Sequence, residues 1–166
     1  MSDDETANAR KLLIYRRDDV PDPSVEGVRL EYNSASDQTE FEGFGAELLP
    51  HYRITVPFEG KPQAPCSLTV VEFGPGYLLP LHSHGVDCLY YVESGSLRMG
   101  SETLGPGDGF FVGKDHPYAY RAGPEGVKVL EFRLGGFQDF KLVEPNVQGW
   151  KNRFRKSVAA PALQDA

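Results

Sequence analysis

The feature that most constrains the fold of this chain is a series of short β-rich segments between residues 53 and 134. The segments are RITVPF (53–58), SLTVVEF (67–73), CLYYVE (88–93), SLRMG (96–100), GFFVG (109–113), YAYRA (118–122) and VKVLEFRL (127–134). Nearly every gap between them contains Gly or Pro, and no helical stretch interrupts the series. Short strands separated by turn residues indicate an all-β sandwich or barrel, because parallel α/β sheets need helical crossovers.

The flanking sequence divides the chain into segments around this core. Residues 1–10 are polar and acidic without periodicity, so we predict a disordered N-terminus. Residues 11–60 alternate short apolar groups such as LLIY and VRLEY with turn-rich clusters. We therefore expect extra N-terminal strands and loops packed on a barrel core that spans residues 61–136.

The C-terminal segment, residues 137–166, has a different pattern. Trp150, Phe154 and Val158 follow one another at intervals of four residues and form one apolar stripe at helical spacing. We predict a single short helix here. The total of 166 residues is about the length of one domain.

Composition and charge exclude several classes of function. Lys and Arg number 17 against 24 Asp and Glu, and the net charge of −7 argues against nucleic acid as a partner. No signal-peptide pattern or long apolar run is present, so we expect a cytoplasmic protein with no membrane partner. Cys66 and Cys88 are the only cysteines, and we expect both to be free thiols.

The strongest local signal is the histidine pair His82 and His84, directly before the CLYYVE segment. Residues i and i+2 of a strand point to the same face, so the two imidazoles lie side by side. Imidazole is a common ligand for Zn, Fe, Ni and Cu. The pair therefore predicts either a metal site or two packed histidines in the core.

The spacing around this pair resembles the first motif of the cupin superfamily, G-x5-H-x-H-x3-E-x6-G. Gly76, His82, His84 and Gly95 occupy the matching positions, and Cys88 stands where the family usually has glutamate.

The second cupin motif, G-x5-P-x-G-x2-H-x3-N, is degenerate in this chain. Gly107 matches its first position, but Gly113, Asp115, Tyr118 and Ala122 replace the expected Pro, Gly, His and Asn. Of the family's metal ligands, only the two histidines of the first motif are present.

The resemblance covers about residues 67–134. It implies an antiparallel jelly-roll β-barrel with an interior site, which in this family usually holds Fe, Mn, Ni or Zn on three histidines and a glutamate. It also implies a homodimer.

The remaining members of a ligand set are open. Cys88 supplies a soft thiolate if it is ionised, and otherwise is a small buried hydrophobic residue. His116 lies two residues before the position of the missing third histidine, and Tyr118 occupies that position. We name His82, His84, Cys88 and His116 as candidate metal ligands.

Strand alternation also predicts several phenols beside the histidines. Tyr90 shares a face with Cys88 and Val92, and Tyr118 shares a face with Tyr120. Although a buried tyrosine usually serves packing, Tyr90 and Tyr118 are candidate catalytic proton donors or bases.

These observations predict a metal-dependent enzyme that acts on a small organic molecule, of dioxygenase or of lyase or isomerase type. Its cofactor would be a divalent transition metal, namely Fe, Mn, Ni or Zn. The alternative is a barrel that binds a small molecule without catalysis, as a sensor or carrier, and the missing glutamate and third histidine favour it.

Overall fold

The computed structural model describes residues 12–16, 18, 29–60, 64–135 and 139–161, so the segment 1–10 that we predicted to be disordered lies outside it. The strands of the larger sheet are β2 (Tyr52–Phe58), β3 (Ser67–Phe73), β5 (Cys88–Met99), β6 (Glu102–Leu104), β7 (Gly109–Val112) and β8 (Arg121–Arg133). Those of the smaller sheet are β1 (Arg29–Glu31), β4 (His82–Ser83) and β9 (Asp139–Leu142). The helical elements are α2 (Ala35–Glu42), α3 (Gly45–Leu48), the 3-10 turn η3 (Leu49–His51) and α4 (Val147–Ala159).

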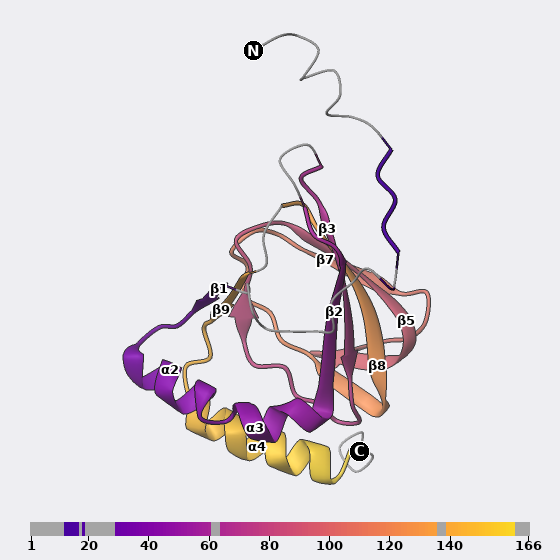
Figure 1. Cartoon of the computed structure of the whole chain (residues 1–166). Helices are drawn as coiled ribbons and strands as arrows, with labels where there is room; N and C mark the ends of the chain where they lie inside the picture. The colour runs from indigo at the N-terminus through magenta and orange to yellow at the C-terminus, as the bar shows by residue number, and fades with distance from the viewer. Residues whose placement is uncertain (1–11, 17, 19–28, 61–63, 136–138, 162–166) are drawn as a thin grey trace.

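The two sheets form opposite sides of a barrel, and the helices lie together at one end of it (Figure 1). The larger sheet has the order β2-β3-β8-β5-β6 with β7 paired to β5, and the smaller has the order β1-β9-β4. This confirms the predicted antiparallel jelly-roll barrel. One pair differs, because β1 and β9 run parallel. A parallel pair needs a long connection, and here the whole barrel lies between the two strands.

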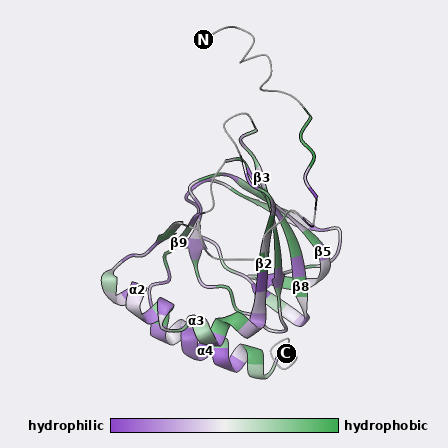
Figure 2. Cartoon of the chain, in the orientation of Figure 1, coloured by the Kyte–Doolittle hydropathy of each residue, from purple (hydrophilic) through white to green (hydrophobic). Residues whose placement is uncertain are grey.

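Alternating burial along the strands places the core between the sheets. Burial alternates along β3 and along the first half of β5, with Cys88, Tyr90 and Val92 inside as predicted. Figure 2 shows the corresponding mixture of hydrophobic and hydrophilic residues along β5 and β8. Both cysteines are free, Cys66 exposed and Cys88 buried.

Strand β5 joins two segments that the sequence suggested were separate. CLYYVE and SLRMG form one twelve-residue strand, and its register with β8 shifts on either side of Ser94 and Gly95. A bulge of this kind bends a strand without ending it.

The N-terminal region contains helices where we expected only strands and loops. Strands β1 and β2 are present, but α2 and α3 lie between them. Ser34 caps α2, because its side chain accepts a hydrogen bond of 3.1 Å from the backbone N–H of Asp37. This satisfies one of the otherwise unpaired N–H groups at a helix start.

The predicted C-terminal helix is confirmed as α4. Trp150 and Phe154 are each only 1% exposed, and Val158 packs beside them partly buried. Both aromatic rings meet Phe44 edge-on, with ring centroids 5.5 Å apart in each pair. Among the helices that the structure describes, none has the length and apolar character needed to cross a membrane.

The two glycines of the first cupin motif both have left-handed backbone conformations. Gly76 has φ of 67° and Gly95 has φ of 72°. A Cβ at Gly76 would collide with the carbonyl oxygen of Ser157, and one at Gly95 with that of Gly126. These motif glycines are therefore required by close backbone packing as well as by conformation.

A matched pair of substitutions separates these two requirements. We expect Gly95→Ala to lower the free energy of unfolding by about 2–5 kcal/mol, from left-handed strain plus overpacking. Gly100→Ala should cost only about 1–2 kcal/mol, because Gly100 has φ of 60° but open space around the added Cβ. Urea unfolding curves measure both values, and equal losses would contradict the steric explanation for Gly95.

Candidate active site

The two histidines are buried at the edge strand β4 of the smaller sheet. His82 begins β4, pairs with Leu142 of β9 and forms a bridge to Tyr118, and His84 follows β4 directly. Both are buried, at 2% and 4% exposure, and their ring centroids are 4.9 Å apart. The predicted side-by-side arrangement of the imidazoles is therefore present.

Backbone carbonyls hold one nitrogen of each imidazole. His82 Nδ1 lies 2.9 Å from the carbonyl oxygen of Pro80, and His84 Nδ1 lies 2.7 Å from that of Asp139. A carbonyl only accepts hydrogen bonds, so both Nδ1 atoms carry a proton and donate. In each ring, Nε2 is therefore the nitrogen that remains to exchange a proton or to bind another group.

An unbroken chain of hydrogen bonds leads away from His84. Its Nε2 lies 3.1 Å from the hydroxyl of Tyr118, and that hydroxyl lies 2.6 Å from the hydroxyl of Tyr90. Tyr90 donates in turn to Glu131 Oε1 at 3.0 Å. Both predicted tyrosines thus link the histidine pair to a buried carboxylate.

Arg133 links the two ends of this series of hydrogen bonds. Its Nε donates to Glu131 Oε1 at 2.7 Å, and its Nη1 donates to the carbonyl oxygen of Asp139 at 3.0 Å. The same carbonyl accepts from His84 Nδ1. The guanidinium therefore connects the carboxylate of Glu131 back to the histidine.

Strand pairing explains why these groups converge. Glu131 lies directly opposite Tyr90 in the β5–β8 pair, and Arg133 lies directly opposite Cys88. Directly opposed residues on one face have Cβ atoms about 5 Å apart. The position that usually carries glutamate in cupins is thus occupied by a thiol, and a carboxylate enters the same interior from the neighbouring strand.

Glu131 and the two phenols have pKa values shifted from those of the free groups. Burial alone would raise the pKa of Glu131, but Arg133, His84 and the hydrogen bonds it accepts hold that pKa below its usual value. Burial raises the pKa of Tyr90 and of Tyr118 well above 10, and the charge of Glu131 adds to both shifts. At neutral pH the site therefore holds an ionised Glu131 and two neutral phenols.

His82 is held neutral by its surroundings. Burial lowers its pKa well below 6.5, and the positive charge of His84 adds to the shift. Its ring stacks on Phe140 with centroids 4.5 Å apart and contacts Tyr118 at 4.3 Å.

These donors do not fit the metal centre that we predicted from the sequence. Burial and the charge of Glu131 raise the pKa of Cys88 to about 12, so it is a protonated thiol that contacts the Val86 carbonyl oxygen at 3.6 Å. His116 is exposed, whereas His82 and His84 are buried. Across the described ranges, no three His, Cys, Asp or Glu side chains converge in a geometry that could hold a metal ion.

The ligand assignments of Cys88 and His116 therefore remain predictions that this geometry does not support. Tyr118, which occupies the position of the missing third histidine, is also unsuited to bind a metal, because its phenol is neutral and bonded to Tyr90 and His84. The carboxylate of Glu131 is bonded to the guanidinium of Arg133.

Three residues of the site were not identified in the sequence, namely Glu131, Arg133 and Asp139. A signal for two of them was present, because alternation in the VKVLEFRL segment puts Glu131 and Arg133 on the same face as Val127 and Val129. Charged residues on the apolar face of a strand indicate a buried pair or a functional group. Asp139 had no such signal, since it lies outside the β-rich series.

The neutral state of His82 predicts a stability that depends on pH. Between pH 6.5 and the lower pKa of folded His82, only the unfolded chain takes up this proton, so stability rises with pH in that window. We expect the free energy of unfolding to fall by up to about 1.4 kcal/mol per pH unit below about pH 6.5. His82→Asn should flatten this slope in urea unfolding, and His116→Asn should leave it unchanged. An unaltered slope in His82→Asn would contradict the prediction.

Comparisons with known proteins give matches only among solved structures. The sequence matches no family model and no curated protein. Among solved structures, KdgF from Halomonas sp. is 17% identical, with a TM-score of 0.48 over 74% of this chain and 94% of that chain. A double-stranded β-helix protein from Klebsiella pneumoniae is 21% identical, with a TM-score of 0.48 over 57% of this chain and 85% of that chain.

A variant of Bacillus subtilis oxalate decarboxylase is 18% identical, with a TM-score of 0.46. That match covers 53% of this chain but only 28% of the decarboxylase. The assignment of the fold rests on features of this chain itself, namely two facing sheets, an inward histidine pair and left-handed glycines at both ends of the first motif. By these features the chain has the fold of the cupin superfamily.

Proposed function

We propose that this barrel binds a small organic molecule beside His82 and His84 and moves a proton to or from it. The protein would be an acid–base enzyme of lyase or isomerase type. The observation that carries the proposal is the continuous chain of hydrogen bonds from His84 through Tyr118 and Tyr90 to Glu131.

Counting the protons in these hydrogen bonds indicates that the series of bonded groups is able to transfer a proton. Its three hydrogen bonds each need one proton, and the two neutral phenols supply two. The third proton is therefore on Nε2 of His84 or on the carboxyl of Glu131. If it moves from one end to the other, both phenols exchange their roles of donor and acceptor. A proton on Nε2 of His84 can thus be passed to Glu131 without movement of a heavy atom.

Arg133 determines which end of this hydrogen-bond series carries the third proton in the resting state. Its hydrogen bond of 2.7 Å keeps Glu131 ionised, so the third proton is at the His84 end. Tyr118 contacts the histidine and Tyr90 contacts the carboxylate. Tyr118 is therefore the phenol that would exchange a proton with His84, and Tyr90 the one that would pass it on.

Hydrogen exchange at carbon tests the proposal directly. We would incubate the protein in D2O with a panel of small hydroxy acids, keto acids and sugar acids, under anaerobic conditions, and follow C–H signals by NMR. We expect at least one compound to exchange, and Tyr118→Phe to slow that exchange by about 10²–10⁴-fold.

Tyr91→Phe is the matched control, because Tyr91 lies on the same strand as Tyr90 but is 45% exposed on the outer face. It should exchange at the wild-type rate. Exchange that is unaffected by Tyr118→Phe would exclude the proposed proton path. If a compound of the panel reacts only when the incubation is repeated with oxygen admitted, that result would instead favour a dioxygenase.

Two alternative functions, a barrel that only binds its ligand and a metal-dependent enzyme, would give different experimental results. A barrel that only binds its ligand is favoured by the mutual satisfaction of the polar groups, since among the described residues no buried side-chain nitrogen or oxygen lacks a partner. A compound of the panel would then raise the melting temperature without any exchange. A metal-dependent enzyme would show near-stoichiometric metal in elemental analysis, which His82→Ala combined with His84→Ala would remove.

A further inference from the structure

Two hydrogen-bond acceptors of the site, Nε2 of His82 and Oε2 of Glu131, have no partner among the described residues. His82 forms its hydrogen bond through Nδ1, to the carbonyl oxygen of Pro80. Glu131 accepts from Tyr90 and from Arg133 at the same oxygen, Oε1. We call Nε2 of His82 and Oε2 of Glu131 the open acceptors.

Both open acceptors are accessible, although their residues are almost buried. His82 is 2% exposed and Glu131 is 4% exposed. Within the described ranges, each fully enclosed side-chain nitrogen or oxygen has a hydrogen-bond partner. The open acceptors have none, so they are not fully enclosed. A nearly buried polar atom of this kind takes its partner from a bound molecule.

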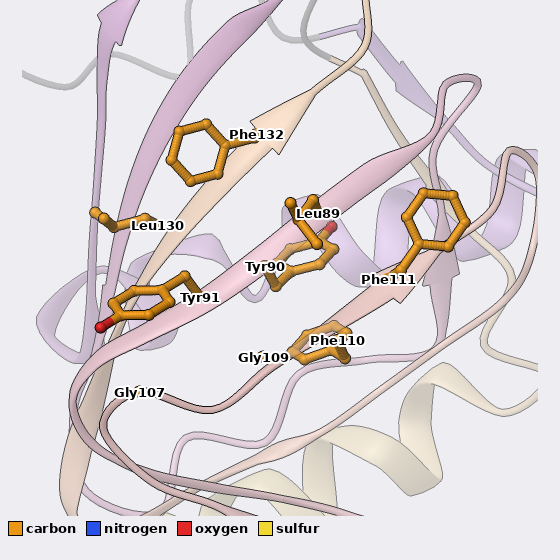
Figure 3. Close-up of a pocket in the computed structure, with 9 residues that line it drawn as sticks. All are labelled: Leu89, Tyr90, Tyr91, Gly107, Gly109, Phe110, Phe111, Leu130 and Phe132. Carbon is orange, nitrogen blue, oxygen red and sulfur yellow. The ribbon is translucent and has the colours of Figure 1, made fainter.

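The open acceptors belong to residues that both lie beside His84. The ring centroid of His84 is 4.9 Å from that of His82, and its Nε2 is 3.8 Å from Oε1 of Glu131. Tyr90 stacks on Phe110 with centroids 4.3 Å apart (Figure 3), which holds its hydroxyl at Oε1 of Glu131 and leaves Oε2 free. One small molecule beside His84 is therefore able to reach both open acceptors.

Both open acceptors require a donor from the ligand. Nδ1 of His82 carries the proton of the neutral ring, so Nε2 presents a lone pair. Glu131 is ionised, and a carboxylate oxygen only accepts hydrogen bonds. A hydroxyl group supplies the donor that each atom needs, whereas a carbonyl or carboxylate oxygen of a ligand cannot.

The positive charge of Arg133 is already compensated. Its guanidinium donates to Glu131 at 2.7 Å and lies 3.4 Å from Oδ1 of Asp139, so one cation faces two carboxylates. An acidic group on the ligand therefore finds no unpaired cation at Arg133. Recognition at this position depends on the hydroxyl groups of the ligand.

We propose that the ligand is a polyhydroxy compound, such as a sugar acid or hydroxy acid, that donates one hydroxyl to Nε2 of His82 and another to Oε2 of Glu131. The inference rests on the proposed binding of a small molecule beside His82 and His84. A site that bonds to a hydroxyl rejects an analogue without it, because its own polar groups are then left unpaired.

Calorimetric titration with matched acids tests this substrate class. The pairs are threonate with butyrate, malate with succinate and gluconate with hexanoate, which share carbon chain and charge but differ in hydroxyl groups. We expect at least one hydroxy acid to bind at least about 100-fold more tightly than its counterpart, since one hydrogen bond to a charged group contributes a factor of about 10–100. The buffer contains EDTA, so that no metal bridges ligand and protein.

Glu131→Gln tests the role of Oε2 with little change of shape. The amide oxygen must stay at the Oε1 position to accept from Arg133, so the open position becomes an N–H donor. We expect the preference for the hydroxy acid to fall by about 10-fold. Glu93→Gln is the matched control, because Glu93 pairs with Lys128 in a largely exposed ion pair, and it should retain the wild-type preference. Circular dichroism verifies that both variants are folded.

NMR of the histidine rings provides the corresponding test for His82. The tightest-binding hydroxy acid should shift the Nε2 signal of His82, while the signals of the exposed His116 should not change. An unchanged His82 signal would overturn the role of this histidine. A preference that survives in Glu131→Gln would overturn the role of Oε2.

The substrate class fails if affinities are equal within every pair, if no hydroxy acid binds, or if binding requires an added divalent metal. The proposed proton transfer fails separately. Deuterium exchange at carbon in a compound without hydroxyl groups would overturn the substrate class and leave the proton path standing. Hydroxyl-dependent binding without any exchange would support the substrate class and count against the proposed enzyme.

Discussion

Arg133→Met is expected to lower the free energy of unfolding by about 3–5 kcal/mol, because it leaves a buried carboxylate without its cation. Glu131 is 4% exposed and Arg133 is 6% exposed, so water cannot replace the lost contact. The substitution keeps most of the side-chain volume of Arg133, so the loss reports charge and hydrogen bonding more than packing. Urea unfolding at neutral pH measures it.

The double variant Arg133→Met, Glu131→Leu provides the decisive control. Apolar residues in place of both members of a buried ion pair are often neutral or stabilising, so we expect the double variant to regain most of the stability lost by Arg133→Met. Lys128→Met, which breaks the largely exposed pair with Glu93, should cost less than about 1 kcal/mol. Additive losses in the double variant would show that Arg133 and Glu131 act independently, contrary to the geometry.

The parts of the site that sequence could predict are those fixed by local spacing. His82 and His84 are two residues apart in a strand context, which is enough to place both imidazoles on one face. The same alternation correctly placed Tyr90 beside Cys88 inside the barrel. Glu131 and Arg133 meet these residues only through the register of β5 against β8, and a single sequence contains no direct record of register.

The position of His116 also depends on backbone geometry that spacing cannot give. Asp115 has φ of 59°, a left-handed conformation in the turn that carries His116. The N–H of Asp115 donates to the carbonyl oxygen of His84 at 2.8 Å. The turn is therefore tied to the backbone of the site, while the imidazole of His116 is exposed.

Helix α2 was missed for a different physical reason. None of its residues is fully buried, so it lacks the apolar stripe that reveals a helix in sequence. Its Ser and Asp residues are also typical of turns. Helix α4 was predictable because Trp150 and Phe154 supply that stripe.

A stack of aromatic rings connects α4 to the site histidine. Trp150 stacks on Phe41 of α2 at 5.6 Å, Phe41 stacks on Phe140 of β9 at 6.0 Å, and Phe140 stacks on His82 at 4.5 Å. Helices that lie outside the β-rich core thereby support one face of the imidazole. We infer that α2 and α4 position His82 as well as covering one end of the barrel.

Trp150→Ala is accordingly expected to lower the free energy of unfolding by about 3–5 kcal/mol, the usual cost of removing a fully buried aromatic ring. The indole also donates from Nε1 to the carbonyl oxygen of Leu78 at 3.1 Å, and Trp150→Phe isolates this bond at a cost of about 1–2 kcal/mol. NMR of the histidine rings reports on the position of His82. Trp150→Ala removes the aromatic stack, so it should shift the His82 ring signals more than Trp150→Phe does. Unchanged His82 signals in Trp150→Ala would show that Phe140 holds the imidazole without the helices.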